Sequence, residues 1–358
     1  MAPFLHLRPK MFIIQLLFAT CCLTVISSPP LAEEAVPVVA HQIERRAAFD
    51  IGSGQIKMLL SDVDVTANKI VKVLIVEHVN VGLREDLAKS LDGRLSTDIQ
   101  NKTVESITGL MKKSAPFHPD SYHAVATESL RLAKNGEELI ERIKVEMGLP
   151  ITIISQKEEG TLGFISAVSK AEVDLKRAVV WDFGGGSTQI TTSCDDHYSI
   201  YQGKFGSVPT KNAVLKIQGK DAAIRTPNPI SQSEMERAVQ LIAESANEVP
   251  KELKEKLSQS DVVVLGIGIN PLWGLPQSET YDRERILAEL TARLNLDDDA
   301  VATKDSIQKA YADRRVSNLI LVYGMMKALN LHEIHYVETP GANAIGLLLS
   351  PQYWQKSE

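Results

Sequence analysis

Two glycine-rich turns, each preceded by an aspartate, constrain the fold of this chain more than any other feature. The later turn follows the apolar run 178–180, and residues 181–189 read Trp-Asp-Phe-Gly-Gly-Gly-Ser-Thr-Gln. Because three successive glycines carry no Cβ, the backbone there can take positive φ and aim consecutive amide groups at an anion. Alternating polar residues follow the turn, and no Gly-Lys-Ser/Thr is present. The pattern therefore predicts a β-hairpin that cradles phosphate, not a strand-to-helix phosphate loop.

The earlier turn repeats the same order of residues. Residues 49–54 read Phe-Asp-Ile-Gly-Ser-Gly, which gives aromatic, Asp, apolar, Gly, small and Gly. A glycine-rich turn between strands is by itself most often only a connection. Asp50 and Asp182 are 132 positions apart, however, and this domain-sized period indicates two related halves that face each other over one ligand.

The two turns predict a phosphate site that also holds a metal ion. Asp50 and Asp182 offer hard carboxylate oxygens, which suit Mg²⁺ or Ca²⁺ beside phosphate. Arg131 is a candidate to hold phosphate oxygens with its planar guanidinium, although a surface arginine beside acidic residues gives the same pattern. The predicted phosphate-binding residues are Gly52, Ser53, Gly54, Arg131, Gly184, Gly185 and Gly186.

An acidic pair, Glu158 and Glu159, begins a predicted helix after the predicted strand 151–155. Acids in a first helical turn are common because they complement the helix dipole. A carboxylate between two phosphate cradles can instead polarise a water for attack on phosphorus, while metal and amide groups absorb the charge. The pair is therefore a candidate source of a general base.

The N-terminal residues do not fit a globular fold. Arg8 and Lys10 precede an apolar run over 11–26, and the small-residue segment 27–32 follows that run. This order of charged, apolar and small residues is typical of a bacterial-type export signal, which we place at residues 1–32.

Cleavage of this signal is expected near Ala32, which leaves residues 33–46 as a tether. Pro30 is unfavourable at the third position before that cut. An uncleaved N-terminal anchor is therefore the alternative to a cleaved signal. The apolar run is close to the ~17-residue lower limit for spanning a bilayer. In both cases we expect an exported protein, periplasmic or secreted, that meets the membrane only through its N-terminal segment.

The net charge bears on nucleic-acid binding, and the cysteine content bears on disulfide bonds and on a cysteine nucleophile. Without residues 1–32 the formal net charge changes from −6 to −8, so binding to a nucleic-acid duplex is not expected. Cys194 is the one cysteine that follows the signal, and no intrachain disulfide is therefore expected. Cys194 fits a small strand residue better than a nucleophile.

Strands alternate with helices along the rest of the chain, after an opening meander of three strands. This order predicts an α/β fold with mixed sheets flanked by helices. Strands are expected at 47–50, 55–63, 70–79, 122–127, 151–155, 262–265, 334–337 and within 179–200. Helices are expected after a capping box at 97–100 and at 135–147, 158–170, 231–246, 282–294 and 306–330, with an irregular loop at 83–96. Predicted domains are 47–170 and 171–340, and the segment 341–358 is expected to complete the fold or return to the first domain.

Five segments carry a resemblance to a known family. They are residues 50–53, 126–136, 153–159, 182–188 and 313–315. With these segments in this order, the chain resembles the exopolyphosphatase/guanosine pentaphosphate phosphohydrolase (Ppx/GppA) family over about residues 46–349. That family falls within the actin, sugar kinase and Hsp70 ATPase fold group. The resemblance implies two ribonuclease-H-like domains facing across a central cleft, Glu159 as general base, and Asp182 near a divalent metal.

The chain departs from the family pattern at Gly54-Gln55, at residues 268–270 and at two positions that lose a charge. Gln189 stands where the family usually has Glu, and Thr161 stands where it has Arg. These losses of charge can weaken metal and polyanion binding or mark a sensor that does not catalyse. Residues 187–190 are also similar to secreted apyrases, a resemblance that implies that Ser187 and Gln189 position the attacking water. An amide suits that role because it both donates and accepts hydrogen bonds.

The sequence thus predicts an enzyme that hydrolyses phosphoanhydride bonds in polyphosphate or guanosine pentaphosphate-type substrates, with a divalent metal and a base-activated water. An apyrase-like nucleoside tri- and diphosphate hydrolase stays open, as does an exported sensor of phosphorylated ligands. A filament-forming role, suggested by the fold group alone, has the least support. The expected partner is the polyphosphate or phosphorylated nucleotide itself, and a homodimer is left open.

Overall fold

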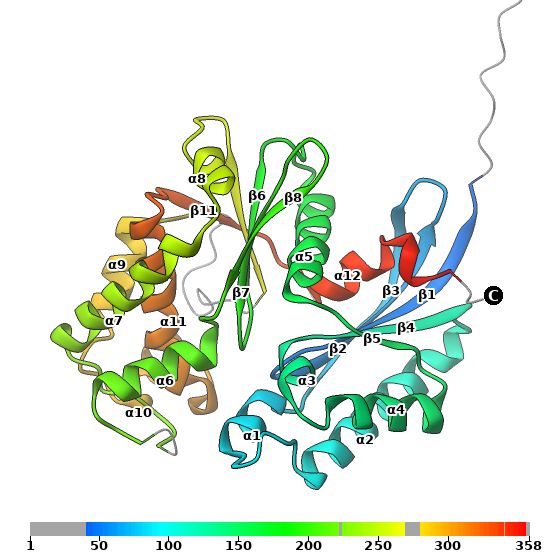
Figure 1. The fold of residues 1–358 in the computed structure, drawn as a ribbon, viewed down its shortest axis with the longest axis horizontal. Coiled ribbons are helices and arrows are strands. Elements are labelled where there is room, and N and C mark those ends of the chain that lie inside the picture. The colour runs from blue at the N-terminus through cyan, green and yellow to red at the C-terminus, as the bar shows by residue number, and fades with distance from the viewer. Residues whose placement is uncertain (1–40, 222–223, 269–279, 340, 356–358) are drawn as a thin grey trace, which may run out of the picture. The chain divides into compact units, whose positions relative to one another are not determined.

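The computed structural model describes residues 41–221, 224–268, 280–339 and 341–355. Residues 41–358 form one compact unit with two β-sheets (Figure 1). The export signal predicted at 1–32 lies outside the described residues. Among the described helices, none combines the length and the hydropathy needed to cross a membrane.

The first sheet has five strands in the order β3-β2-β1-β4-β5. They are β1 Ile43–Ile51, β2 Gln55–Asp64, β3 Lys69–Asn80, β4 Ser121–Ala126 and β5 Ile151–Ile153. β1, β2 and β3 form an antiparallel meander, whereas β4 is parallel to β1 and β5 is parallel to β4. The register pairs Asp50 with Val125, so the first glycine turn and the end of β4 lie at the same edge of the sheet.

Helices cover one face of this sheet with a hydrophobic cluster that includes Phe49, Ile107, Leu110 and Leu139. The helices that follow the first meander are α1 Leu83–Lys89, α2 Thr97–Ser114, α3 Glu128–Leu132 and α4 Gly136–Met147. α2 begins after Ser96, whose Oγ accepts from the Ile99 amide at 3.3 Å. The helix cap is therefore one residue earlier than the capping box predicted at 97–100.

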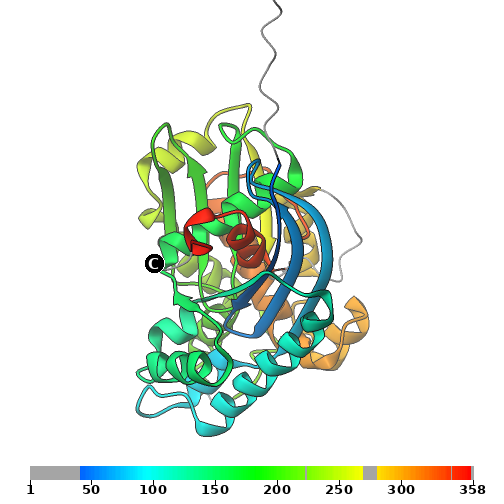
Figure 2. The same ribbon diagram turned by 90° about the vertical axis from the view of Figure 1, so that its right-hand side faces the viewer.

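Two helices contact each other and the opposite face of the first sheet. α5 (Gln156–Ala171) and α12 (Ala342–Leu348) lie side by side in both views, and α12 packs on β1 and β2 (Figures 1 and 2). An added Cβ on Gly346 would overlap the Leu162 carbonyl, so a glycine permits this close helix approach. Nη1 of Arg46 also donates to the carbonyl of Leu348 at 3.2 Å. The C-terminal segment therefore contacts the strand that begins the fold.

The second sheet has six strands in the order β10-β11-β9-β6-β7-β8. They are β6 Ala178–Phe183, β7 Thr188–Ser193, β8 Tyr198–Gly203, β9 Val263–Gly268, β10 Thr280–Asp282 and β11 Glu333–Tyr336. β6, β7 and β8 form an antiparallel meander, and β9 is parallel to both β6 and β11. This arrangement repeats the first meander, as the repeated glycine turn predicts.

The remaining helices belong to the second half of the chain. They are α6 Ser207–Ile217, α7 Gln232–Ser245, α8 Lys251–Leu257, α9 Arg283–Thr291, α10 Asp298–Asp305 and α11 Lys309–Ala328. The described 3₁₀ turns are Ala115–Phe117 in the first half and Ala246–Glu248 and Pro351–Tyr353 in the second. α11 is largely buried, and it contacts α6, α7, α9 and α10. Because α11 is buried on most sides, polar residues such as Asp313 and Arg315 included, it forms the centre of this helical layer.

The predicted α/β fold with two mixed sheets flanked by helices is confirmed. The irregular loop predicted at 83–96 is wrong, because α1 forms there with Leu83 and Leu87 buried one turn apart. β1 begins at Ile43, inside the segment 33–46 predicted as a tether, because this stretch pairs with β2 up to Asp64. The short helices α6, α8 and α10 were not predicted.

Candidate active site

Two hairpin turns form the centre of the candidate site, one between β1 and β2 and one between β6 and β7. The first turn is closed by the Gly52 amide, which donates to the Gln55 carbonyl at 3.0 Å. At the second turn, the carbonyls of Gly184 and Gly185 accept from the first amides of α6, at 3.1 and 2.9 Å. The N-terminus of an unpredicted helix therefore lies against the second turn.

The glycines of these turns have a different role from the one predicted. Gly52, Gly54, Gly184 and Gly186 do not take positive φ. Gly52, Gly184 and Gly186 are needed for space: an added Cβ would lie 3.1 Å from the Gln55 carbonyl, overlap the Ser187 carbonyl, or overlap the Glu128 carboxylate, respectively. An added Cβ on Gly54 would meet nothing within 4 Å. The prediction of left-handed backbone here is wrong, because close approach of neighbouring groups, not backbone strain, is what excludes larger residues.

Three buried acids converge on the ends of these strands. Asp50 and Asp182 each lie one residue before the end of their strands, β1 and β6, and Glu159 lies in the first turn of α5; each is 5–7% exposed. Burial and the charge of Asp182 raise the pKa of Glu159 to about 8, although Arg131 opposes the rise. Burial also raises the pKa of Asp182 to about 6 and raises that of Asp50. Ionisation of all three neighbours therefore costs free energy that a bound cation would offset.

The aspartates fit a divalent cation. Oδ1 of Asp50 is buried and accepts no hydrogen bond within the part of the chain that the structure describes. Glycines flank Asp182: an added Cβ on Gly163 would lie 3.1 Å from Oδ2, and one on Gly268 would overlap Oδ1. Lys57, opposite Asp50 in the β1–β2 register, lowers the pKa of both aspartates. Buried carboxylate oxygens, one of them without a hydrogen bond from the described residues, suit Mg²⁺ or Ca²⁺.

Gln189 lies beside Asp182 and close to the helix that carries Glu159. The two residues are direct partners in the β6–β7 ladder, so their side chains share one face of the sheet. Nε2 of Gln189 donates to Oγ of Ser187 at 3.1 Å, and an added Cβ on Gly160 would lie 3.3 Å from Cβ of Gln189. The structure thus brings Ser187, Gln189 and the start of α5 together.

Arg131 contacts the candidate base directly. Its Nη2 donates to Oε2 of Glu159 at 3.4 Å, and its Nη1 donates to the carbonyl of Ile154 at 2.5 Å. These bonds fix the guanidinium at the start of α5 and leave its side chain about one quarter exposed. Arg131 therefore lies where it can meet both Glu159 and an anion.

Two charged residues of the site were given no role from the sequence. Glu128 begins α3, and its Oε2 accepts from Oγ of Ser53 at 3.3 Å and lies 3.7 Å from Nε of Arg84. Arg84 itself donates its backbone amide to the Ser53 carbonyl at 2.9 Å. Glu128 lies in the segment 126–136, which carries the family resemblance. Its contacts with Ser53 and Arg84, however, become visible only from the packing of α1 and α3 against the first turn.

A cluster of cations surrounds Asp313 in α11. Nζ of Lys211 and Nε of Arg225 lie 3.7 and 3.8 Å from Oδ2 of Asp313, and Nε of Arg314 lies 3.5 Å from its Oδ1. Arg314 also pairs with Glu85 of α1 at 3.5 Å. Because α6 carries Lys211 and begins at the second glycine turn, this cluster adds positive charge on that side of the site.

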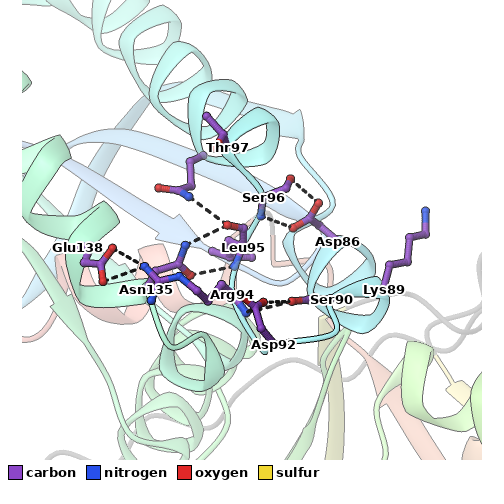
Figure 3. Close-up of a pocket in the computed structure, with 11 residues that line it drawn as sticks. Asp86, Lys89, Ser90, Asp92, Arg94, Leu95, Ser96, Thr97, Asn135 and Glu138 are labelled. Carbon is purple, nitrogen blue, oxygen red and sulfur yellow. Dashed lines mark hydrogen bonds and ion pairs between the residues drawn. The ribbon is translucent and has the colours of Figure 1, made fainter.

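A hollow of about 540 Å³ in the described part of the chain is lined by none of the predicted site residues. It lies between α1 and the start of α2, with residues of α4 and its cap on one side (Figure 3). Its polar groups bond to one another: the Asn135 side chain donates to and accepts from the Leu95 backbone, and Arg94 pairs with Glu138 at 2.7 Å. These bonds hold the loop before α2, so we assign the hollow no catalytic role.

The architecture and sequence match known phosphatases. A sequence model of the Ppx/GppA phosphatase family matches residues 63–339. The Aquifex aeolicus member of that family has a TM-score of 0.68 at 18% identity, over 88% of this chain and 100% of that chain. An exopolyphosphatase from Cytophaga hutchinsonii has a TM-score of 0.65 at 15% identity, over 86% of this chain and 98% of that chain. These likenesses show a two-domain, actin-like fold.

Proposed function

Because the chain belongs to the Ppx/GppA phosphatase family and is a phosphoanhydride hydrolase, we propose that it hydrolyses the terminal anhydride of polyphosphate, guanosine pentaphosphate or a related nucleotide. One observation carries the proposal: the buried carboxyl of Glu159 lies among Asp50, Asp182 and Arg131, and its pKa responds to all three. A buried carboxyl with a pKa raised towards neutrality is suited to take a proton from water.

Members of this family generally depend on a divalent metal. We propose that Asp50 and Asp182 hold Mg²⁺ or Ca²⁺, directly or through water, because the unpaired Oδ1 of Asp50 offers a free ligand atom. When bound, the ion would neutralise phosphate charge and offset the repulsion among the three acids.

Proton transfer, water orientation and phosphate binding are carried out by side chains and amides of this protein. The carboxylate of Glu159 accepts a proton from water as the water oxygen bonds to the terminal phosphorus, and the bond from phosphorus to the bridging oxygen breaks. Ser187 and Gln189 orient this water, since Oε1 of Gln189 accepts from no described residue and is open to one of its protons. Arg131 and the amides of the two glycine turns other than that of Gly52, which donates to the Gln55 carbonyl, bind the phosphate oxygens.

A nucleoside tri- and diphosphate substrate is the second candidate. The bond between Gln189 and Ser187 favours it, because this pair forms the water-positioning arrangement implied by the apyrase resemblance. A neutral amide also leaves less negative charge to repel a nucleotide phosphate than a carboxylate would.

Phosphate release by the purified protein tests these functions. Polyphosphate, guanosine pentaphosphate and nucleoside tri- and diphosphates would each be offered with Mg²⁺, with Ca²⁺ and with EDTA. Metal-dependent release from polyphosphate or guanosine pentaphosphate supports the first candidate, and preference for nucleoside phosphates supports the second. Tight binding of these ligands without release would instead identify a sensor.

We also propose that the protein acts outside the cytoplasm, on the basis of the charged, apolar and small-residue order of residues 1–32. N-terminal sequencing of protein recovered outside the cytoplasm should then start within a few residues of Glu33. Full-length protein confined to the cytosol would rule this out.

A further inference from the structure

Three side chains of metal-binding type meet at the turn between β7 and β8, on residues to which the hydrolase site gives no role. Cys194 and His197 stand at the two ends of this turn, and the Cys194 amide donates to the His197 carbonyl at 2.8 Å. Glu252 reaches them from the first turn of α8. One ligand atom from each residue lies within 4.8 Å of the other two.

The spacing of these atoms suits a small tetrahedral ion. Nε2 of His197 lies 3.2 Å from Oε2 of Glu252. In a tetrahedral zinc site, bonds of about 2.0–2.2 Å to nitrogen and oxygen give an N···O edge of about 3.4 Å. The histidine and glutamate are therefore already close to the separation that a shared zinc ion requires, and Sγ of Cys194 lies within 4.8 Å of the ligand atom of each.

A second carboxylate orients the histidine. Nδ1 of His197 lies 2.9 Å from Oδ1 of Asp196, so a proton on Nδ1 is donated to Asp196 and the lone pair of Nε2 faces Glu252. Metal-ligating histidines in proteins are usually held by such a carboxylate. Without a cation, the same contacts form an exposed ion pair of a protonated imidazole with two acids.

We propose that Cys194, His197 and Glu252 form a Zn²⁺ site, completed by water, that fastens the β7–β8 turn to α8. A thiolate and an imidazole select zinc over Mg²⁺ and Ca²⁺, which prefer oxygen ligands alone. Because β8 is the edge strand of the second sheet, the ion ties that edge to the helix beside it. Because a thiol binds zinc as the thiolate, metal binding must release its proton.

Titration of the full chain with Co²⁺ and Zn²⁺ tests this site. Cys21 and Cys22 are first replaced by Ser, which leaves Cys194 as the one thiol, and the protein is stripped with EDTA. We expect one equivalent of Co²⁺ to give a thiolate-to-cobalt absorption band that Zn²⁺ abolishes, and Zn²⁺ to raise the melting temperature. His197→Ala should remove the band, and Asp196→Asn should weaken binding about 10- to 100-fold.

Matched variants separate this site from the catalytic one and from misfolding. Glu252→Gln should weaken Zn²⁺ binding, whereas Glu255→Gln, an exposed change on the same helix, should not. Asp182→Asn should retain the band. Unchanged melting of the metal-free variants shows that they are folded. Absence of the band from the parent chain, or undiminished Zn²⁺ binding by Cys194→Ser, overturns the proposal.

Discussion

The carboxylate of Glu128 lies directly against Gly186, so that an added Cβ on this glycine would overlap Oε2. The same oxygen accepts from Oγ of Ser53 in the other glycine turn. Glu128 comes from the first half of the chain and Gly186 from the second, and the two turns are therefore joined through one carboxylate. An anion bound by both turns would compete with this carboxylate for the space between them.

We expect Glu128→Gln to lower KM for polyanionic substrates by roughly tenfold, because a like charge a few ångströms away costs on the order of 1 kcal/mol or more. kcat should change little, since Glu128 is not assigned to proton transfer. Steady-state kinetics with polyphosphate checks this, with the exposed Glu141→Gln as control. An unchanged KM would mean that the side chain of Glu128 moves aside at no cost.

Glu159→Gln keeps the shape of the side chain and removes its basicity. If Glu159 is the general base, kcat should fall roughly 10²- to 10⁴-fold while ligand affinity changes little. Glu158→Gln is the matched control, because Glu158 forms a capping box with Ser155 and should affect stability more than kcat. Near-normal turnover by Glu159→Gln would assign the base elsewhere.

The variant Gln189→Glu distinguishes the two proposed substrate classes, polyphosphate-type substrates and nucleoside tri- and diphosphates. A carboxylate next to Asp182 and close to Glu159 would lose the bond to Ser187 and raise the pKa of Glu159 further. We expect turnover to fall on the order of tenfold or more and the pH optimum to move upward. Faster hydrolysis of polyphosphate would show instead that a carboxylate at this position helps to bind metal.

The stability of the metal-free protein should fall as pH rises from about 4.5 to 8. The folded state holds protons on Glu159, with a pKa of about 8, and on Asp182, with a pKa of about 6, that the unfolded chain has already lost. Each carboxyl contributes a slope of up to about 1.4 kcal/mol per pH unit while only the unfolded chain is ionised.

Denaturant unfolding in EDTA across this pH range measures that slope. Glu159→Gln should flatten it, and Mg²⁺ or Ca²⁺ should restore stability most strongly at the alkaline end, where the acids are ionised. If the free energy of unfolding of the parent protein did not change with pH, the burial of these acids next to one another would be contradicted.

Gly268→Ala tests the space around Asp182. Gly268 has φ of +93° and an added Cβ there would overlap Oδ1 of Asp182, whereas Gly219 has φ of +69° with nothing within 4 Å. Both alanine variants should lose about 1–2 kcal/mol through the backbone. Gly268→Ala should lose more and should also weaken divalent-metal binding, measured by calorimetry; equal effects would place Asp182 away from the metal.

The sequence by itself determined the features that depend on neighbouring residues. The repeated aspartate and glycine turns predicted two similar meanders. The strands and long helices were predicted from the spacing of apolar residues and from helix-capping residues, such as Ser231 before α7. These signals are local because a strand, a turn or a cap is set by residues within one or two turns of chain.

Only the tertiary structure decided which distant side chains meet. Glu128 against Gly186, Gln189 beside the start of α5, and Glu252 next to His197 each join segments that no sequence period relates. The role of Gly186 likewise came from a neighbour in space and not from its own φ. Such contacts depend on how sheets and helices pack, and packing is decided by the summed burial of many side chains rather than by any one motif.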